Sequence, residues 1–336
     1  MRRCFLLLAP LFLLSAGCDS SSNSDRGASS ADGDGTTSEL ESERLALNWY
    51  MEMEHGGYVA AKVHGYFSDG GLDVTIEPGG PGAPQQVIQL LATGKLKFGI
   101  ANADQIVTAR AKGTALVALA APLQHTPRCI MVHEASGFGS LKDIKGVELA
   151  ISEGRPFSEW LKQECPLDKV TMVPFSGNVG EFLLKENFAQ QGYVFSEPVV
   201  AKKRGANPKA LMLSEIGFDP YASLLVTTED VIKSDPDLVQ EMVEASVAGW
   251  FQYLHEPEIT HKYIEEQNSD MDEETLSLGL ERMRPLCTLE IDTMCRMETE
   301  RWQQLIDQIT ELKMIEQGSV QAADCFTNEF LGPASR

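Results

Sequence analysis

Residues 45–80, LALNWYMEMEHGGYVAAKVHGYFSDGGLDVTIEPGG, predict a strand, a helix and a second strand in close succession. LALNW alternates apolar and polar side chains, as a half-buried strand does. YVAAKVHGYF places apolar residues at helical spacing, Gly70 and Gly71 end that helix, and LDVTIE returns to a period of two. The polar, aromatic and glycine-rich loop after the first strand lies where open α/β sheets bind ligands.

The alternation of strands and helices continues along the chain. Short runs with strand character recur as FGIAN, ALVALAA, CIMVH, VELAIS, VTMVPF, GYVFS, ALMLS and SLLVTT, with helical segments among them. From about Asp235 the pattern is almost wholly helical, and Asp235 is suited to cap a helix that begins at Pro236. We therefore predict an α/β fold with parallel sheets and crossover helices.

The order of residues in 45–80 resembles the thiamine-pyrimidine-precursor and riboflavin type of periplasmic substrate-binding protein. In that family a strand ending in Asn-Trp leads through a short loop into a GYF…GLDV helix and strand, and the resemblance extends to about Pro257. It implies a two-lobed type II periplasmic binding protein with parallel-rich mixed sheets, two crossing strands and C-terminal helices. The ligand would lie in the cleft between the lobes.

Mapped onto this chain, the resemblance assigns residues 44–130 and 223–336 to the first lobe and residues 131–222 to the second. Polar breaks lie near both crossings, at QHTP (124–127) and FDPY (218–221). We expect closure of the lobes on the ligand to be a hinge motion.

The N-terminal residues predict export. Arg2 and Arg3 precede FLLLAPLFLL, an apolar run too short to span a bilayer and typical of a signal peptide. Small residues before Cys18 resemble a bacterial lipobox, although Ser15 replaces the usual leucine; an ordinary signal peptide with an incidental cysteine is the alternative. We expect a signal peptide over 1–17, lipidation of Cys18, and a flexible polar tether over 18–43.

The chain contains seven cysteines. Apart from one in the signal and Cys18, an odd set is left, which argues against a full disulfide framework. An oxidising compartment would permit one pair, and we expect a possible bridge between Cys287 and Cys295, which are close in sequence. No Cys-x-x-Cys or Cys/His cluster has zinc spacing, so we predict neither a metal nor a cofactor. The formal charge of -21 supplies no basic surface for phosphates and makes nucleic-acid binding improbable.

The loop after the first strand supplies the first candidate ligand-binding residues, which are Asn48, Trp49, Glu54, His55, Gly57 and Tyr58. Trp49 could stack on a planar heterocycle and Glu54 could accept a hydrogen bond from an exocyclic amine. The alternative places Trp49 in the core and His55 on an exposed loop.

Two further candidates follow the strand FGIA, where Asn102 and Asp104 would face the cleft or cap the next helix. Gln124 lies at the first crossing and could bridge the lobes, whereas the adjacent His125 could equally be a surface residue of a hinge.

The segment QQGYVFSEP (190–198) supplies Gln191, Tyr193 and Glu197 as candidates. The resemblance implies that Tyr193 and Glu197 face the ligand, with Glu197 accepting a hydrogen bond from an aminopyrimidine; a salt bridge to the basic residues 202–204 is the alternative. SEG (152–154) and SGN (176–178) each precede a helix, whose N-terminus could accept an anionic group or could simply be capped.

The fold that this resemblance implies is shared with eukaryotic thiamine-pyrimidine synthases, which use a lysine that holds pyridoxal phosphate, a histidine close after it and a cysteine-rich iron motif. The matching places here are Ala101, Gln105 and residues 217–222, GFDPYA, and none of them carries the required group. Fold alone does not distinguish a binding protein from an enzyme. Because the required groups are missing, we predict a binding protein and not an enzyme.

The predicted function is that of a lipid-anchored, extracytoplasmic solute-binding protein, at the periplasm or the outer face of the cell membrane. Its partners would be a small heterocyclic ligand and the permease and ATPase of an ABC importer, and we expect a monomer. A thiamine pyrimidine precursor is the first choice of ligand, riboflavin the second, and nitrate or a sulfonate the third. A tethered ligand sensor is an alternative of another class.

Overall fold

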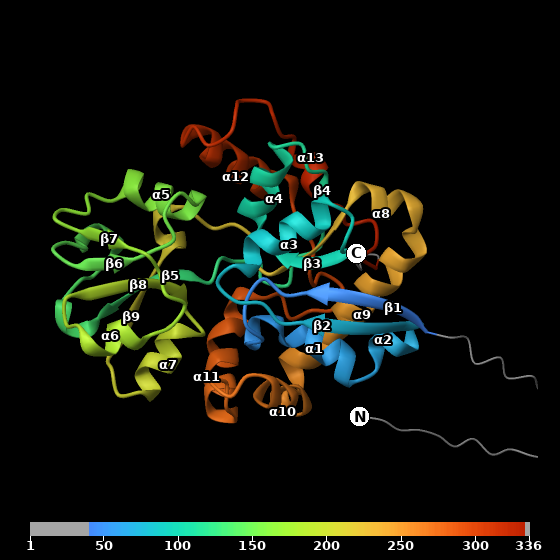
Figure 1. The fold of residues 1–336 in the computed structure, drawn as a ribbon, viewed down its shortest axis with the longest axis horizontal. Helices are drawn as coiled ribbons and strands as arrows, with labels where there is room; N and C mark the ends of the chain where they lie inside the picture. Colours follow the sequence, from blue (N-terminus) through green and yellow to red (C-terminus); the bar gives the residue numbers. More distant parts are fainter. Residues whose placement is uncertain (1–39, 333–336) are drawn as a thin grey trace, which may run out of the picture. The chain divides into compact units, whose positions relative to one another are not determined.

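Two five-stranded mixed sheets organise residues 40–332, the part of the chain that the computed structural model describes (Figure 1). The predicted signal peptide, Cys18 and the tether as far as residue 39 lie outside the described residues. Within the described part, no helix is both long enough and apolar enough to cross a bilayer.

The first sheet has the strand order β2-β1-β3-β10-β4. Its strands are β1 (Glu41–Ala46), β2 (Leu72–Glu77), β3 (Phe98–Ala101), β4 (Leu116–Ala120) and β10 (Leu224–Thr228). β1 runs parallel to β2 and β3, whereas β10 runs antiparallel to β3 and β4.

The second sheet has the order β7-β6-β8-β5-β9. Its strands are β5 (Arg128–His133), β6 (Glu148–Ala150), β7 (Thr171–Val173), β8 (Phe188–Tyr193) and β9 (Pro208–Met212). β6 is parallel to β7 and β8, and β5 is antiparallel to β8 and β9. The predicted mixed α/β fold is confirmed. Parallel and antiparallel pairings are balanced rather than parallel-rich, because β5 and β10, the strands that the chain enters after crossing between sheets, each oppose both neighbours.

Helices connect the strands and cover the sheets (Figure 1). They are α1 (Gly56–Val63), α2 (Tyr66–Asp69), α3 (Ala83–Ala92), α4 (Ala103–Arg110), α5 (Pro156–Glu164), α6 (Gly180–Leu184), α7 (Glu197–Lys203), α8 (Glu229–Ser234), α9 (Pro236–His255), α10 (Glu258–Gln267), α11 (Glu273–Met283), α12 (Thr299–Glu311) and α13 (Ala322–Cys325). As predicted, the Asp235 carboxylate caps α9 by accepting a hydrogen bond from the Leu238 N–H.

Three predicted boundaries differ from the structure. β1 begins at Glu41, inside the predicted tether, because its main chain pairs with β2 from that residue onward and Lys97 forms ion pairs with Glu41 and Glu43. The predicted helix over 58–67 is divided at Gly65, whose φ of 84° is left-handed. The second sheet already begins at Arg128, so the crossing into it precedes the predicted boundary at 130.

The strand predicted from GYVFS is displaced toward the N-terminus. β8 ends at Tyr193, and residues 194–196 turn into α7. Glu197 therefore begins a helix and does not end a strand, with Pro198 in the first helical turn, where its missing N–H costs no hydrogen bond.

The predicted bridge between Cys287 and Cys295 does not form, and both thiols are free. The two residues make different main-chain contacts to the segment after β4. Cys295 O accepts from the N–H of Ala121, whereas Cys287 pairs with Leu123.

Packing of α1 on α9 supports the loop that follows β1. A Cβ at Gly57 would lie 2.1 Å from Cγ of Trp250, and a Cβ at Gly249 would lie 2.2 Å from the Gly57 carbonyl oxygen. The two helices can approach this closely because both contact points are glycines. Trp160, Trp250 and Trp302 are buried.

Candidate functional site

A pocket lies where strand ends of the two sheets meet, and it encloses about 850 Å³ of space not occupied by atoms, part of it open to solvent. Loops after β1 and β3 form one side, and β5, β8 and the loops after β6 and β7 form the other. The lining residues are Asn48, Trp49, Glu52, Glu54, Pro81, Pro84, Asn102, Asp104, Gln105, Arg128, Ser152, Arg155, Phe157, Phe175, Gln191, Gly192, Tyr193, Ser196 and Glu197.

An aromatic pair contributes to both sides of the pocket. The Trp49 indole, after β1, is stacked with the Phe175 ring, after β7, at 13° between planes and 6.3 Å between centroids. Both rings are only partly buried and line the pocket. They provide flat apolar surface of the kind that binds a planar heterocycle.

His55 orients Asn48 from behind the pocket wall. Its Nδ1 accepts from the Glu52 N–H, at 3.4 Å, so its Nε2 carries the hydrogen and donates to Asn48 Oδ1, at 3.0 Å. Burial lowers the pKa of His55 to about 3, so the imidazole is neutral and its 3.9 Å approach to Glu54 is not an ion pair. The Asn48 Nδ2 hydrogens therefore remain available to a ligand.

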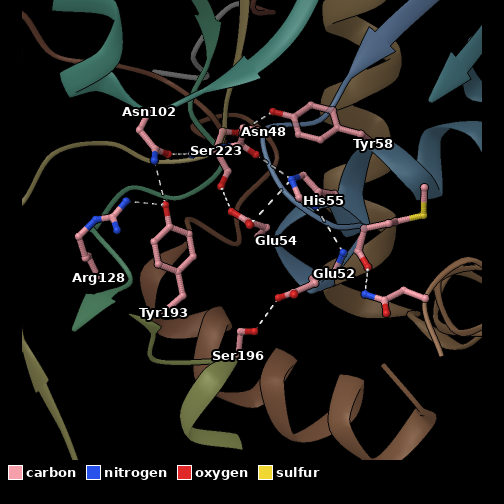
Figure 2. Close-up of polar contacts among 12 residues, drawn as sticks. Asn48, Glu52, Glu54, His55, Tyr58, Asn102, Arg128, Tyr193, Ser196 and Ser223 are labelled. Carbon is pink, nitrogen blue, oxygen red and sulfur yellow. Dashed lines mark hydrogen bonds and ion pairs between the residues drawn. The ribbon is translucent and has the colours of Figure 1, made fainter. Parts of the chain in front are cut away.

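Two buried glutamates line the pocket beside Asn48 (Figure 2). Ser196 Oγ donates to Glu52 Oε2 and Ser223 Oγ donates to Glu54 Oε2, each at 2.6 Å. Burial raises the pKa of Glu52 well above its usual range, with a further contribution from the charge of Glu197, and burial raises that of Glu54 to about 7. Near neutral pH, Glu54 can thus either accept or donate a hydrogen bond.

Glu197 adds a third carboxylate, at the start of α7. Its Oε2 accepts from the Tyr193 N–H at 2.7 Å, and its pKa is raised by burial. A Cβ at Gly192 would lie 2.8 Å from this oxygen, so the glycine admits the carboxylate. The alternative salt bridge does not form, because Lys203 pairs with Asp272 and Glu274, and Arg204 pairs with Asp270.

Tyr193 joins the two sides of the pocket (Figure 2). Its hydroxyl oxygen accepts from Asn102 Nδ2 at 2.9 Å and from Arg128 Nη2 at 3.4 Å, and Asn102 Oδ1 accepts from the Ser223 N–H at 3.0 Å. Because burial raises the pKa of Tyr193, the phenol is neutral. With two donors already on its oxygen, its own hydrogen is free for a ligand.

Eight of the predicted ligand-binding residues line this pocket: Asn48, Trp49, Glu54, Asn102, Asp104, Gln191, Tyr193 and Glu197. Asn102 is also the N-cap residue of α4, and its N–H donates to Gln105 Oε1, so the cap and the pocket wall are one feature. Asp104 lies in the first turn of the same helix.

The other four predicted residues lie elsewhere. His55 is fully buried behind Asn48, and Gly57 faces Trp250 in the contact between α1 and α9. The Tyr58 hydroxyl donates to the Ser223 carbonyl at 2.9 Å, so it positions the partner of Glu54 and lines no part of the pocket. Gln124 Nε2 donates to the carbonyls of Ala121 and Arg296 and thereby anchors the crossing to the C-terminal segment.

Several lining residues are not among the ligand-binding residues predicted from the sequence. Phe175 is the last residue of the predicted strand VTMVPF and follows the observed β7, so the rule that ligands bind at strand ends could have found it. The sequence shows no hydrogen-bond partner for Glu52, because its partner, Ser196, lies far along the chain. Arg128 begins an antiparallel strand and Arg155 precedes α5, and no local pattern marks either one as facing the cleft.

The profile described as NMT1/THI5 like matches residues 52–260, more than half of the chain and nearly all of the pocket. The chain belongs to the NMT1/THI5-like family. The pocket residues from Glu52 to Glu197 fall inside the matched range, and only Asn48 and Trp49 precede it.

The chain is similar to curated proteins whose names refer to a pyrimidine or to riboflavin. The formylaminopyrimidine-binding protein of Halalkalibacterium halodurans is 24% identical, covering 96% of this chain and 97% of that protein. The 4-amino-5-hydroxymethyl-2-methylpyrimidine phosphate synthase of Legionella pneumophila is 21% identical over 85% of this chain and 91% of the synthase. Riboflavin-binding protein RibY of Chloroflexus aurantiacus is 21% identical over 65% and 64%.

Solved structures share the fold of this NMT1/THI5-like chain. The periplasmic aliphatic sulphonate binding protein SsuA of Escherichia coli superposes with a TM-score of 0.65 at 16% identity, covering 84% of this chain and 91% of SsuA. A Candida albicans protein described as having the generic periplasmic binding protein fold gives 0.63 at 14% identity, over 87% and 98%. At these identities the likeness establishes the periplasmic binding protein fold alone.

Proposed function

We propose that this protein is the solute-binding component of an ABC importer and captures an amino-substituted planar heterocycle, a pyrimidine precursor of thiamine. The observation that carries the proposal is the pocket itself. Stacked rings of Trp49 and Phe175 adjoin the buried carboxyl groups of Glu52 and Glu54 and the half-buried Glu197. The rings suit a flat heterocycle, and the carboxyl oxygens suit its amine.

Protonated Glu54 would supply a hydrogen-bond donor that suits an aminopyrimidine. An aminopyrimidine presents a hydrogen-bond donor, its amine, beside an acceptor, its ring nitrogen. A carboxyl group whose pKa is raised to about 7 can donate to the ring nitrogen while a neighbouring carboxylate accepts from the amine. The name of the Halalkalibacterium relative, which matches nearly the whole chain, supports the same ligand class.

Capture without catalysis is part of the proposal. The synthase relatives make an enzyme the natural competitor, but Ala101 and Gln105 occupy the places of the lysine and histidine that the synthase chemistry would use. Of the free thiols in residues 40–332, none lines the pocket. The two sheets with their helices act as two lobes that close on the ligand, and Cys18 carries the lipid that holds the protein outside the cytoplasmic membrane.

The test is calorimetry and thermal shift of the purified full chain against a panel. The panel contains 4-amino-5-hydroxymethyl-2-methylpyrimidine, its formylaminomethyl analogue, thiamine, riboflavin, taurine and nitrate. A pyrimidine should raise the free energy of unfolding by about 2.7 kcal/mol at a hundredfold excess over its Kd. Trp49→Ala and Glu197→Ala should each weaken binding at least about tenfold. Phe251→Ala, which removes a partly exposed ring from α9, is the matched control and should not.

A response to riboflavin, taurine or nitrate alone would overturn the choice of ligand. No response to any member of the panel would overturn heterocycle capture. Turnover of pyridoxal phosphate and release of a pyrimidine product would replace binding by the synthase activity.

A further inference from the structure

The side of the pocket formed by the second sheet carries hydrogen-bond donors that lack partners. Arg128 and Arg155 both line the pocket, and within residues 40–332 neither guanidinium forms an ion pair with a carboxylate. The Arg128 guanidinium makes one hydrogen bond, to the Tyr193 hydroxyl, and the Arg155 guanidinium makes none to any described residue. Two nearby cations are therefore left with most of their donors unused.

Neighbouring groups add to this donor surface. Gln191 is 7% exposed, and its Oε1 accepts from the Ser152 N–H at 2.6 Å, which turns Nε2 away from Ser152. Neither that Nε2 nor the Ser152 hydroxyl has a hydrogen-bond partner in the described part of the chain, and both residues line the pocket. We call Arg128, Ser152, Arg155 and Gln191 the donor wall.

The carboxylates of the pocket act on the arginines of the donor wall through their charge, but no carboxylate in residues 40–332 forms an ion pair with either guanidinium. In Figure 2, Arg128 and the pair Glu52 and Glu54 are drawn on either side of the Tyr193 ring. The charge of Asp104 acts on both arginines, and the charges of Glu54 and Glu197 also act on Arg128. Burial lowers the pKa of Arg155, the charge of Asp104 raises it, and the positive charge of Arg128 lowers it. A bound anion would relieve this repulsion.

The orientation of Arg128 is set before any ligand arrives. Its guanidinium carbon lies 4.1 Å from the centroid of the Phe157 ring and 5.0 Å from that of Tyr193, so two aromatic faces hold it. A planar guanidinium held in this way presents a fork of N–H donors that matches the oxygens of a phosphate, sulfonate or carboxylate. A purely structural arginine would be expected to use those donors on the protein.

From these contacts we infer that the ligand carries an oxyanion substituent at the end opposite its amine, and that the donor wall binds that substituent. The inference rests on the proposed function and narrows it: the natural ligand is an anionic amino-heterocycle, such as a monophosphate, and not a neutral one. The glutamates select the amine and the donor wall selects the oxyanion. The glutamates and the donor wall line the same pocket, so a ligand that carries both an amine and an oxyanion would explain why acidic residues and arginines occur there together.

The experiment compares matched ligands by calorimetry on the full chain. The probes are 4-amino-5-hydroxymethyl-2-methylpyrimidine and its monophosphate, with inorganic phosphate and taurine measured alone. The wild-type protein should bind the monophosphate at least about tenfold more tightly than the alcohol. Arg155→Gln should weaken the monophosphate by about 10- to 100-fold and leave the alcohol within about threefold.

Arg204→Gln is the matched control, because Arg204 pairs with Asp270 on the surface and does not line the pocket. It should change neither affinity, and thermal unfolding should verify that both variants are folded. Arg128→Lys, which keeps a charge but loses the planar fork, should also reduce the preference for the monophosphate.

The outcomes separate the two proposals. Equal affinities in the wild type, or a preference that survives Arg155→Gln, would overturn the oxyanion subsite while binding of the alcohol still upheld pyrimidine capture. Binding of taurine or inorganic phosphate without either pyrimidine would support the subsite and overturn the proposed function. Binding of none of the four probes would overturn both.

Discussion

The Trp49 indole lies nearly parallel to the Phe175 ring, although Trp49 follows a strand of the first sheet and Phe175 a strand of the second. The two residues are more than a hundred positions apart in the chain. A ring centroid separation of 6.3 Å exceeds that of closely stacked rings and lies close to the roughly 7 Å that one intercalated ring requires. A small opening between the sheets would therefore admit a heterocycle.

Replacement of Phe175 tests this aromatic pair. We expect Phe175→Leu to weaken binding of the pyrimidine by about tenfold or more, since stacking on an aromatic ring contributes about 1–3 kcal/mol. Phe175→Tyr keeps the ring face and should retain affinity within about threefold. Calorimetry on the three proteins provides the comparison, and an equal loss in both variants would argue that the ring face is not what binds.

Glu54 should make stability depend on pH. Its folded pKa of about 7 lies above its ordinary value of 4.5, so the folded state holds the proton more tightly. The stabilisation is fully present below pH 4.5 and is lost as the pH rises through about 7, which amounts to about 2–3 kcal/mol between pH 5 and 8. Urea unfolding at both pH values should show a larger loss in the wild type than in Glu54→Gln, because the raised pKa values of Glu52 and Glu197 act in both proteins and only the difference comes from Glu54.

Two features help to isolate the contribution of Glu54 when the wild type is compared with Glu54→Gln. His55, whose folded pKa is about 3, is present in both proteins, and its opposite contribution cancels in the difference. Glu77→Gln is the matched control: the Arg44 hydrogen bond lowers the pKa of Glu77, so this group stays ionised from pH 5 to 8. A Glu54→Gln profile parallel to that of the wild type would show that Glu54 ionises normally.

Gly57 should matter for stability and not for ligand contact. In Gly57→Ala the new methyl group would overlap the Trp250 indole, and we expect a loss of about 1–3 kcal/mol or more in the free energy of unfolding. Gly82→Ala, where no atom lies within 4 Å of the added Cβ and φ is -87°, should change stability by no more than about 0.5 kcal/mol. Thermal unfolding measures both, and a stable Gly57→Ala protein would contradict the packing of α1 on α9.

The free thiols predict insensitivity to reductant. Because Cys287 and Cys295 are not bridged, dithiothreitol should leave the unfolding midpoint unchanged, and both residues should be alkylated after denaturation without prior reduction. Peptide mass spectrometry reads out the alkylation. Recovery of a peptide pair joined through these two cysteines would contradict the structure.

Local pattern was sufficient for much of the fold. The period of two in LDVTIE predicts β2 at its observed bounds, and Asp235 before Pro236 predicts the start of α9. Local pattern failed where the extent of a strand depends on the strand that pairs with it. β1 extends back to Glu41 because β2 offers main-chain partners that far, and β8 begins before GYVFS and ends at its Tyr193 because β5 and β6 pair with residues 188–193.

For the site, residue type and position at a strand end sufficed for Trp49, Glu54, Asn102 and Tyr193, since the carboxyl ends of parallel strands gather at one edge. These choices needed only the order of elements along the chain. The same reasoning misplaced Tyr58 and Gly57, because it cannot tell which face of the following helix is buried against α9.

Tertiary structure alone decided the chemistry of the pocket. The raised pKa of Glu54 arises from burial among segments that are distant in sequence, and the partner of Glu52 is Ser196, brought by the return of the chain from the second sheet. Arg128 and Arg155 enter the pocket only because β5 and α5 fold against the first sheet's loops. Hydrogen bonding and electrostatic energy depend on separations of a few ångströms, and local sequence pattern does not specify distances between segments far apart in the chain.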